Sequence, residues 1–284
     1  MSEHLRASLG GKLYSATHTD ENWDTHPDNP RAAGDAFKFS RGYVRRNYER
    51  YPYGSIGVRF EDSDIKLIPR DEWKDRIKAR VEAKRTAYDV VSRTKLPCQD
   101  QDGLPYCWTY AVITSIEIER ARRNYPYVQL APECVAATIK KGRAEGGWST
   151  AACRFIRDKG VCSMDLWPHW DRNYRKYDTP EVWADAARTK ITFVELEPRN
   201  VDQHVSALLQ DYTCPVGLNY WSHAVGDTDP LWVGESRNVI DNIGVRFRNS
   251  WRSSYGDNGF GVRTGSKKFA DDICAIYSVT PSNN

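Results

Sequence analysis

The sequence has no long apolar run and no strong excess of charge of either sign. No stretch approaches the 18 or more apolar residues of a membrane-spanning helix, and the segment Met1 to Arg6 lacks the apolar core of a signal peptide. The 41 basic residues are nearly balanced by 38 acidic ones, so charge gives no reason to expect binding to nucleic acid or to a membrane surface. We therefore expect a soluble protein that is cytoplasmic or otherwise intracellular, with neither nucleic acid nor a membrane as a partner.

Cysteine is sparse and shows no metal-binding spacing. Cys153 lies in a helical pattern and Cys274 in a strand-like run, which suits buried, reduced thiols better than a disulfide framework. No pair has the Cys-x-x-Cys spacing of a structural zinc site, so we expect no metal and no cofactor. The seven cysteines, an odd number, are Cys98, Cys107, Cys134, Cys153, Cys162, Cys214 and Cys274.

One of these cysteines stands where a thiol becomes reactive. Gly103 and Pro105 mark a turn before Cys107-Trp108, and small and apolar residues follow it. Cys107 is therefore predicted in the first turn of a buried helix, where the helix dipole lowers the pKa of a thiol below its free value of about 8.5. Because a free cysteine is most often a buried structural thiol, this prediction of a nucleophile also requires a base.

Two later segments provide a base and a group to orient it. His223 is followed by Ala224-Val225, and an alternating strand that begins near Gly244 ends on Asn249. With the motifs around them, these segments resemble the papain-like cysteine peptidases over about residues 95 to 280. In chain order the motifs are Gln101, Cys107-Trp108, Leu130-Ala131-Pro132-Glu133, Gly146-Gly147-Trp148, His223-Ala224-Val225, Asn249-Ser250-Trp251 and Gly256-Asp257-Asn258-Gly259-Phe260.

The resemblance implies a catalytic role for four of these residues. Cys107 would be the nucleophile, and His223 would be its general base and acid. Asn249 would orient the imidazole, and the indole of Trp251 would shield that contact from water. His223 lies 116 residues after Cys107, and Asn249 lies 142 residues after Cys107. In the family both spacings are about 130 to 150 residues. The histidine is early, which we explain by a shorter region before it and a long hairpin after it.

The resemblance also implies the oxyanion and substrate contacts. Gln101, six residues before the nucleophile, would stabilise the oxyanion, although the neighbouring Gln99 competes for that role. Gly146 and Gly147 would bind the substrate backbone, and Ser222 and Ala224 would help to wall a side-chain pocket.

Helical patterns come first in the chain and strand patterns second. This order predicts an α+β fold, and the resemblance implies a two-lobed domain over residues 65 to 284. The helical lobe would span about 95–190 and the β-rich, barrel-like lobe about 191–284. Helices are predicted at 71–93, 107–124, 132–143, 149–159, 179–189 and 201–212, a strand at 191–196, and a long hairpin through 227–242.

Residues 1–64 form a polar N-terminal arm without a helical or alternating pattern of useful length. Within it, Lys38 to Tyr53 interleaves arginines with tyrosines, which suits either a solvated tail or a surface that wraps a protein partner. The long helical inhibitory segment of the family is not recognisable here. We therefore favour a protein partner bound through residues 1–60 over an arm that only covers the cleft.

Two functions from different classes stay open. The first is a cysteine endopeptidase that acts on a peptide or protein substrate. The alternative is a papain-fold structural or interaction subunit of a large assembly, for example a virus particle, with little or no turnover. Pro105-Tyr106 stands where the family has Gly-Ser before its nucleophile, and this change and the long arm both suit the alternative.

Overall fold

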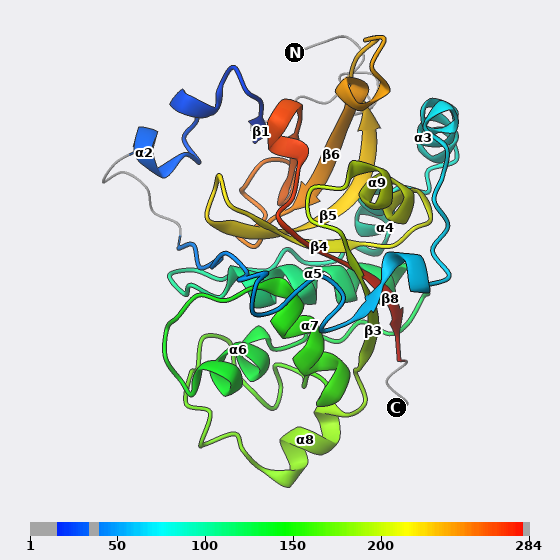
Figure 1. Ribbon diagram of the computed structural model, residues 1–284. Coiled ribbons are helices and arrows are strands. Elements are labelled where there is room, and N and C mark those ends of the chain that lie inside the picture. Colours follow the sequence, from blue (N-terminus) through cyan, green and yellow to red (C-terminus); the bar gives the residue numbers. More distant parts are fainter. Residues whose placement is uncertain (1–15, 34–39, 281–284) are drawn as a thin grey trace.

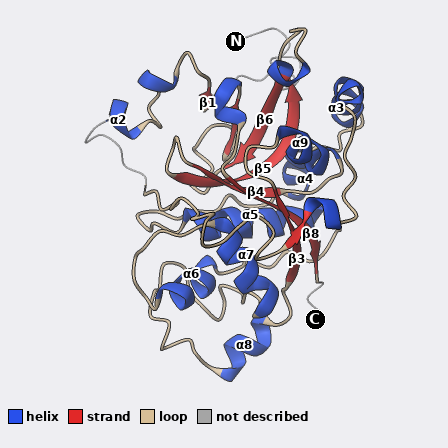
Figure 2. Ribbon diagram, in the orientation of Figure 1, coloured by secondary structure: helices blue, strands red, loops and turns tan. Residues whose placement is uncertain are grey.

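The computed structural model describes residues 16–33 and 40–280 of the chain, so part of the predicted arm lies outside the described residues. The order of elements is that of an α+β fold, as the sequence predicts (Figures 1 and 2). The helices are α2 (Pro30–Ala33), α3 (Trp73–Glu82), α4 (Ala87–Thr94), α5 (Cys107–Arg122), α6 (Pro132–Lys140), α7 (Ser149–Asp158), α8 (Pro180–Ala186) and α9 (Val201–Leu209).

The strands form one eight-stranded sheet in the order β1-β7-β6-β5-β4-β8-β3-β2. The predicted long hairpin is present, with β5 and β6 antiparallel and Trp232 opposite Ile243. The strands are β1 (Thr17–His18), β2 (Val58–Arg59), β3 (Ile191–Leu196), β4 (Cys214–Leu218), β5 (His223–Trp232), β6 (Ile243–Arg248), β7 (Phe260–Arg263) and β8 (Asp272–Val279).

Both edges of this sheet are formed by the arm. β1 pairs in parallel with β7, and β2 pairs in parallel with β3. Each of these two strands has only two residues, which is too short to show an alternating pattern in the sequence. The arm is therefore built into the sheet rather than attached to its surface.

The single helix predicted over 71–93 is wrong, because the chain breaks there into α3 and α4. Lys84 has a left-handed backbone with φ of 51°. Two residues later Thr86 opens a new helix through a capping box, in which its hydroxyl accepts from the N–H of Asp89 at 3.2 Å and its own N–H donates to the Asp89 carboxylate at 3.0 Å. Local hydrogen bonds of this kind outweigh the continuous amphipathic pattern.

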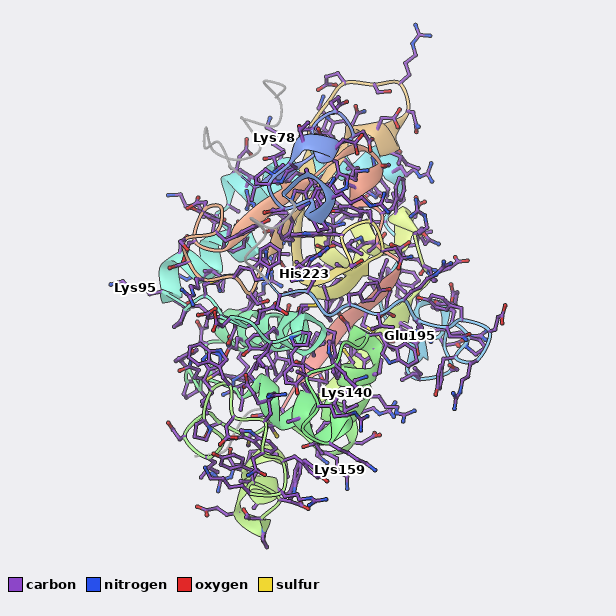
Figure 3. The ribbon with its side chains drawn as sticks, turned by 90° about the vertical axis from the view of Figure 1, so that its left-hand side faces the viewer. Lys78, Lys95, Lys140, Lys159, Glu195 and His223 are labelled. Carbon is purple, nitrogen blue, oxygen red and sulfur yellow. The ribbon has the colours of Figure 1, made fainter. Side chains whose placement is uncertain are left out.

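Helix α5 lies between the sheet and the helices α6, α7 and α8 (Figure 1). Every residue from Cys107 to Ala121 is buried, charged residues such as Glu117 included, so this helix is enclosed on all sides rather than along one apolar stripe. In Figure 3, His223 lies between Lys78, on the side of the β-rich part, and Lys140 and Lys159, on the side of the helical part. The first turn of α5 thus meets the sheet where the two parts of the molecule join.

Within residues 16–33 and 40–280, no helix combines the length and the apolar character that crossing a membrane would require.

Candidate active site

Cys107 is the first residue of α5, as predicted. A turn closed by a hydrogen bond from the N–H of Leu104 to the carbonyl of Gln101, at 3.0 Å, leads the chain into the helix. The preceding Tyr106 offers no side-chain cap, so backbone N–H groups of the first turn face the thiol region unscreened by a capping group. The side chain of Cys107 is completely buried.

The structure brings His223, Asn249 and Trp251 together. His223 opens β5 and Asn249 directly follows β6, and the antiparallel pairing of these strands places the two side chains side by side. Nε2 of His223 lies 2.8 Å from Oδ1 of Asn249. The ring of Trp251 lies 4.4 Å from the imidazole, between centroids, at 31°, and so covers this contact.

Burial favours the neutral forms of both Cys107 and His223. Burial raises the pKa of the Cys107 thiol to about 12, although nearby backbone N–H groups such as that of Ala224 oppose the shift. Burial likewise lowers the pKa of His223 to about 3 against the hydrogen bond to Asn249. The lowered thiol pKa expected from the helix dipole is therefore wrong for this form, because desolvation outweighs the dipole. Among the described residues, Nδ1 of His223 has no hydrogen-bond partner.

Of the two competing glutamines, Gln101 faces the cleft. Its amide nitrogen donates to the carbonyl of Ser40 at 2.9 Å, and its amide oxygen accepts from the hydroxyl of Ser250 at 2.6 Å. Gln99 instead donates to both carboxylate oxygens of Glu117, at 2.8 and 2.9 Å. The amide nitrogen of Gln101 thus donates to two carbonyl oxygens, that of Ser40 in the arm and that of Leu104 at 2.8 Å.

Residues 40–44, which we call the cleft segment, lie against the backbone predicted to bind substrate. Gly147 donates its N–H to the carbonyl of Gly42 and accepts from the N–H of Val44, both at 2.8 Å. The N–H of Tyr43 donates to the carbonyl of Ser222 at 3.3 Å. Tyr43 and Gly147 thus form a parallel bridge. The predicted substrate contacts are occupied by the chain itself.

The cleft segment also contacts the nucleophile. The N–H of Gly42 donates to Sγ of Cys107 at 3.2 Å. A Cβ on Gly42 would lie 1.9 Å from the carbonyl oxygen of Pro105, and one on Gly146 would lie 2.4 Å from the carbonyl oxygen of Gly42. Glycine at both positions permits this close approach of two backbones.

Tyr43 is buried at 6% exposure in a pocket that the sequence did not identify. Its ring lies directly on the backbone of Gly217 in β4, where a Cβ would come within 2.0 Å of the ring. Neither residue belongs to a motif. The one available signal was the Arg-Gly-Tyr-Val run at residues 41–44, a glycine within a polar arm followed by two residues that favour extended backbone.

In the described part of the chain, one trio of possible metal ligands comes together, formed by His18, His26 and Asp28 within 4.8 Å. Nε2 of His18 already lies 2.9 Å from the Asp28 carboxylate, and Nδ1 of His26 accepts the N–H of Asp28 at 3.1 Å. Because these groups bond to one another, we interpret the trio as a hydrogen-bonded cluster.

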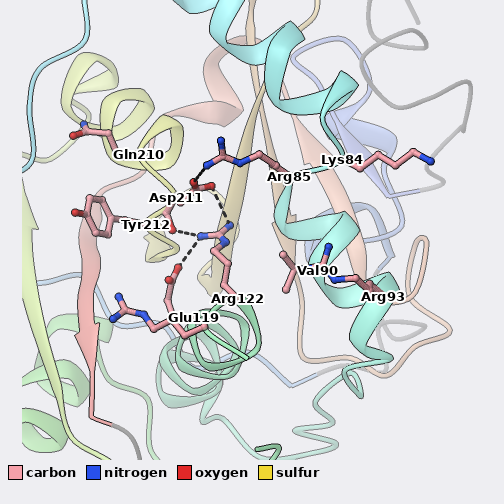
Figure 4. A pocket seen from close by; sticks show the side chains of 10 residues that line it. Lys84, Arg85, Val90, Arg93, Glu119, Arg122, Gln210, Asp211 and Tyr212 are labelled. Atoms are coloured by element: carbon pink, nitrogen blue, oxygen red, sulfur yellow. Dashed lines mark hydrogen bonds and ion pairs between the residues drawn. The ribbon is translucent and has the colours of Figure 1, made fainter. Parts of the chain in front are cut away.

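A pocket of about 500 Å³ opens at the other end of α5, far from the nucleophile (Figure 4). Two of its basic side chains form ion pairs: Arg122 pairs with Glu119 at 2.9 Å, and Arg85 pairs with Asp211 at 3.3 Å. Helices α3, α5 and α9 all end here, and cations stabilise the negative ends of helix dipoles. We therefore assign these residues to the fold rather than to chemistry.

No family model and no curated protein matches the sequence. Solved structures do match. The cysteine protease xylellain from Xylella fastidiosa superposes with a TM-score of 0.57 and 15% identity, over 84% of this chain and 96% of that chain. Digestive procathepsin L 3 from the larval midgut of Tenebrio molitor superposes with a TM-score of 0.58 and 15% identity, over 96% of this chain and 86% of that chain. Procathepsin L2 from the same tissue superposes with a TM-score of 0.57 and 13% identity, over 95% of this chain and 86% of that chain.

At 13–15% identity, only the fold is carried across from these neighbours. The chain has the fold of the papain-like cysteine peptidases.

Proposed function

We propose that the chain is a cysteine endopeptidase with Cys107 as nucleophile, His223 as base and acid, and Asn249 as the group that orients the imidazole. The main support is the 2.8 Å contact between His223 and Asn249 under the ring of Trp251, since the backbone N–H of the adjoining Ala224 reaches the thiol of Cys107. A neutral imidazole held in one orientation, with Nδ1 unpaired in the described structure, is suited to accept the thiol proton.

The chemistry follows from these positions. The Cys107 thiolate attacks a peptide carbonyl carbon, and the resulting oxyanion receives hydrogen bonds from Gln101 and from the backbone N–H of Cys107. Protonated His223 then gives its proton to the departing amine, which leaves an acyl-enzyme thioester. His223 next takes a proton from water, which attacks the thioester and releases the acid and the thiol.

In the described form this peptidase is latent. The cleft segment presents an N–H to Sγ of Cys107, rather than a carbonyl carbon, and it occupies both backbone positions of Gly147. It also keeps water from the thiol and the imidazole, and a dry site opposes the formation of their ion pair. These contacts favour an arm that covers the cleft, the alternative that the sequence placed second. Association through residues 1–60, and the role of an assembly subunit without turnover, stay predictions.

The first test is covalent labelling with an epoxysuccinyl peptide, followed by intact mass. We expect one adduct per chain, slow in the intact protein, and absent from Cys107→Ala. Cys98→Ala is the matched control, because Cys98 is the least buried of the cysteines and should leave labelling unchanged. An adduct that survives Cys107→Ala, or no adduct after the cleft segment has been displaced, would contradict the proposed function.

A further inference from the structure

The arm contributes a second cluster of polar groups behind the catalytic histidine. The indole of Trp221 lies between the two histidines His223 and His18, with ring centroids 4.7 Å and 4.4 Å away. Its N–H donates to the backbone carbonyl of Asp28 at 3.1 Å. Trp221 is fully buried, so its position, and with it one wall around the imidazole of His223, depends on a residue of the arm.

Asp28 carries one negative charge in this cluster. Its carboxylate accepts from the hydroxyl of Tyr255 at 2.6 Å and from Nε2 of His18 at 2.9 Å, while Nδ1 of His18 accepts from Tyr220 at 3.1 Å. Burial lowers the pKa of His18 to about 4, so His18 is neutral and does not cancel the charge of Asp28. Burial alone would raise the pKa of Asp28, but the hydrogen bonds from His18 and Tyr255 outweigh it and hold this pKa below its ordinary value.

The charged and titratable groups around His223 come from the Asp28 turn, the cleft segment, β1 and α5. Asp28 favours the protonated imidazole of His223. Arg41 of the cleft segment opposes it, and so would His18 if it were protonated. Cys107 on α5 adds a negative charge when it becomes a thiolate, and Asn249 accepts from the ring. When the cleft segment leaves, Arg41 leaves with it. Asp28 is then the fixed anion of this set.

We propose that Asp28 is a positioning residue of the active site: its backbone carbonyl holds Trp221 against His223, and its carboxylate stabilises the imidazolium that the Cys107 thiolate requires. This inference rests on the proposed function. It has a consequence for activation, since residues 16–33 must stay in the active enzyme. Their attachment fits this role, because Thr17 pairs with Val262, His18 pairs with Arg263, and the carbonyl of His18 accepts the N–H of Thr264 at 2.9 Å. Within the part of the chain that the structure describes, residues 40–44 are then the ones that need to move.

The test is the titration of His223, measured by NMR on histidine-labelled protein in a Gly42→Ala background that opens the cleft. Asp28→Asn should lower the pKa of His223, because it removes a carboxylate that favours the protonated imidazole. Asp28→Glu should restore most of the shift. The matched control is Asp24→Asn, which removes an exposed carboxylate of the same loop and should change nothing.

The kinetic counterpart is the alkaline limb of peptide hydrolysis, which Asp28→Asn should move to lower pH. If Asp28→Asn fails to fold, Asp28→Ser replaces it, since Trp221 bonds to a backbone carbonyl that every variant keeps. A titration of His223 that is equal in Asp28→Asn and Asp24→Asn overturns this inference, even in an active enzyme. A shifted titration in a protein that never hydrolyses a peptide supports it while the proposed function fails.

Discussion

Glu117 is a buried carboxylate on the helix that carries the nucleophile. Burial raises its pKa to about 7, against hydrogen bonds from Gln99 and the N–H of Leu130. Between the unfolded pKa of about 4.3 and this value, the folded protein binds more protons than the unfolded one, so stability falls as pH rises.

The expected loss from this one group between pH 5 and pH 8 is about 2–3 kcal/mol. Glu117→Gln should remove most of it, because the amide stays neutral across the range. Urea unfolding at the two pH values measures the difference. Glu181→Gln, at an exposed glutamate of α8, is the control that should keep the full pH dependence. An equally steep dependence in Glu117→Gln would show that other groups cause it.

At the residue scale the motifs predicted the identities in the candidate site better than its charge state. His223 and Asn249 lie together, and Gln101 and Cys107 both contact the cleft segment, because each of these residues stands in a motif with its own turn or strand end. The thiol pKa was predicted in the wrong direction, because burial under the cleft segment is a long-range contact. Asp28, Tyr43 and Gly217 were not predicted, since a single polar, aromatic or small residue carries no periodic signal.

At the scale of elements, prediction succeeded where a pattern was long. The helices at α5, α6, α7, α8 and α9 and the strand β3 were predicted with small errors at their ends, since each has enough residues to show its period. β1 and β2 were not, because two residues cannot show a period and their partners are more than 100 residues away. Short strands of this kind are held by what surrounds them.

The second half of the arm is held by Glu195 of β3. This buried carboxylate accepts from Arg46 at 2.8 Å and from the N–H groups of Ile56 at 2.8 Å and Gly54 at 3.0 Å, and also from that of Gly57. Removing one partner of a buried ion pair typically costs about 3–5 kcal/mol, because the other charge is left unpaired. Residues 46–59 should therefore be the part of the arm that this single carboxylate anchors.

Glu195→Gln is expected to raise hydrogen exchange in residues 46–59 by at least about tenfold, since about 1.4 kcal/mol of lost local stability corresponds to that factor. Exchange measured by mass spectrometry resolves this segment. Glu197→Gln, two residues along the same stretch and exposed, should exchange as the unchanged protein does. Unaltered protection of residues 46–59 in Glu195→Gln would mean that β2 pairing alone holds the arm.

At the scale of the whole molecule, the arm is fastened on both sides of the cleft. Residues 16–33 are attached to β7 through β1, and through the hydrogen bonds of Asp28. Residues 46–59 are attached to Glu195 and to β3. The cleft segment lies between these two attached parts of the arm. The α+β order of elements followed from the sequence, because helical and strand periods are local. The course of the arm did not, since it depends on backbone contacts with residues more than 100 positions away.

The measurement that tests the central claim most directly compares peptide hydrolysis by Gly42→Ala with that of the unchanged protein. A Cβ at residue 42 would overlap the carbonyl oxygen of Pro105 at 1.9 Å, so the cleft segment must leave its place. Overpacking of this kind costs about 1–3 kcal/mol, which corresponds to a gain in hydrolysis of about 5- to 150-fold.

Gly103→Ala is the matched control, because it adds the same methyl group nearby where no atom lies within 4 Å. We predict that Gly42→Ala hydrolyses peptides faster, that Gly103→Ala does not, and that adding Cys107→Ala to Gly42→Ala abolishes the gain. Hydrolysis that stays undetectable in folded Gly42→Ala protein, or a gain that persists without Cys107, would contradict the account.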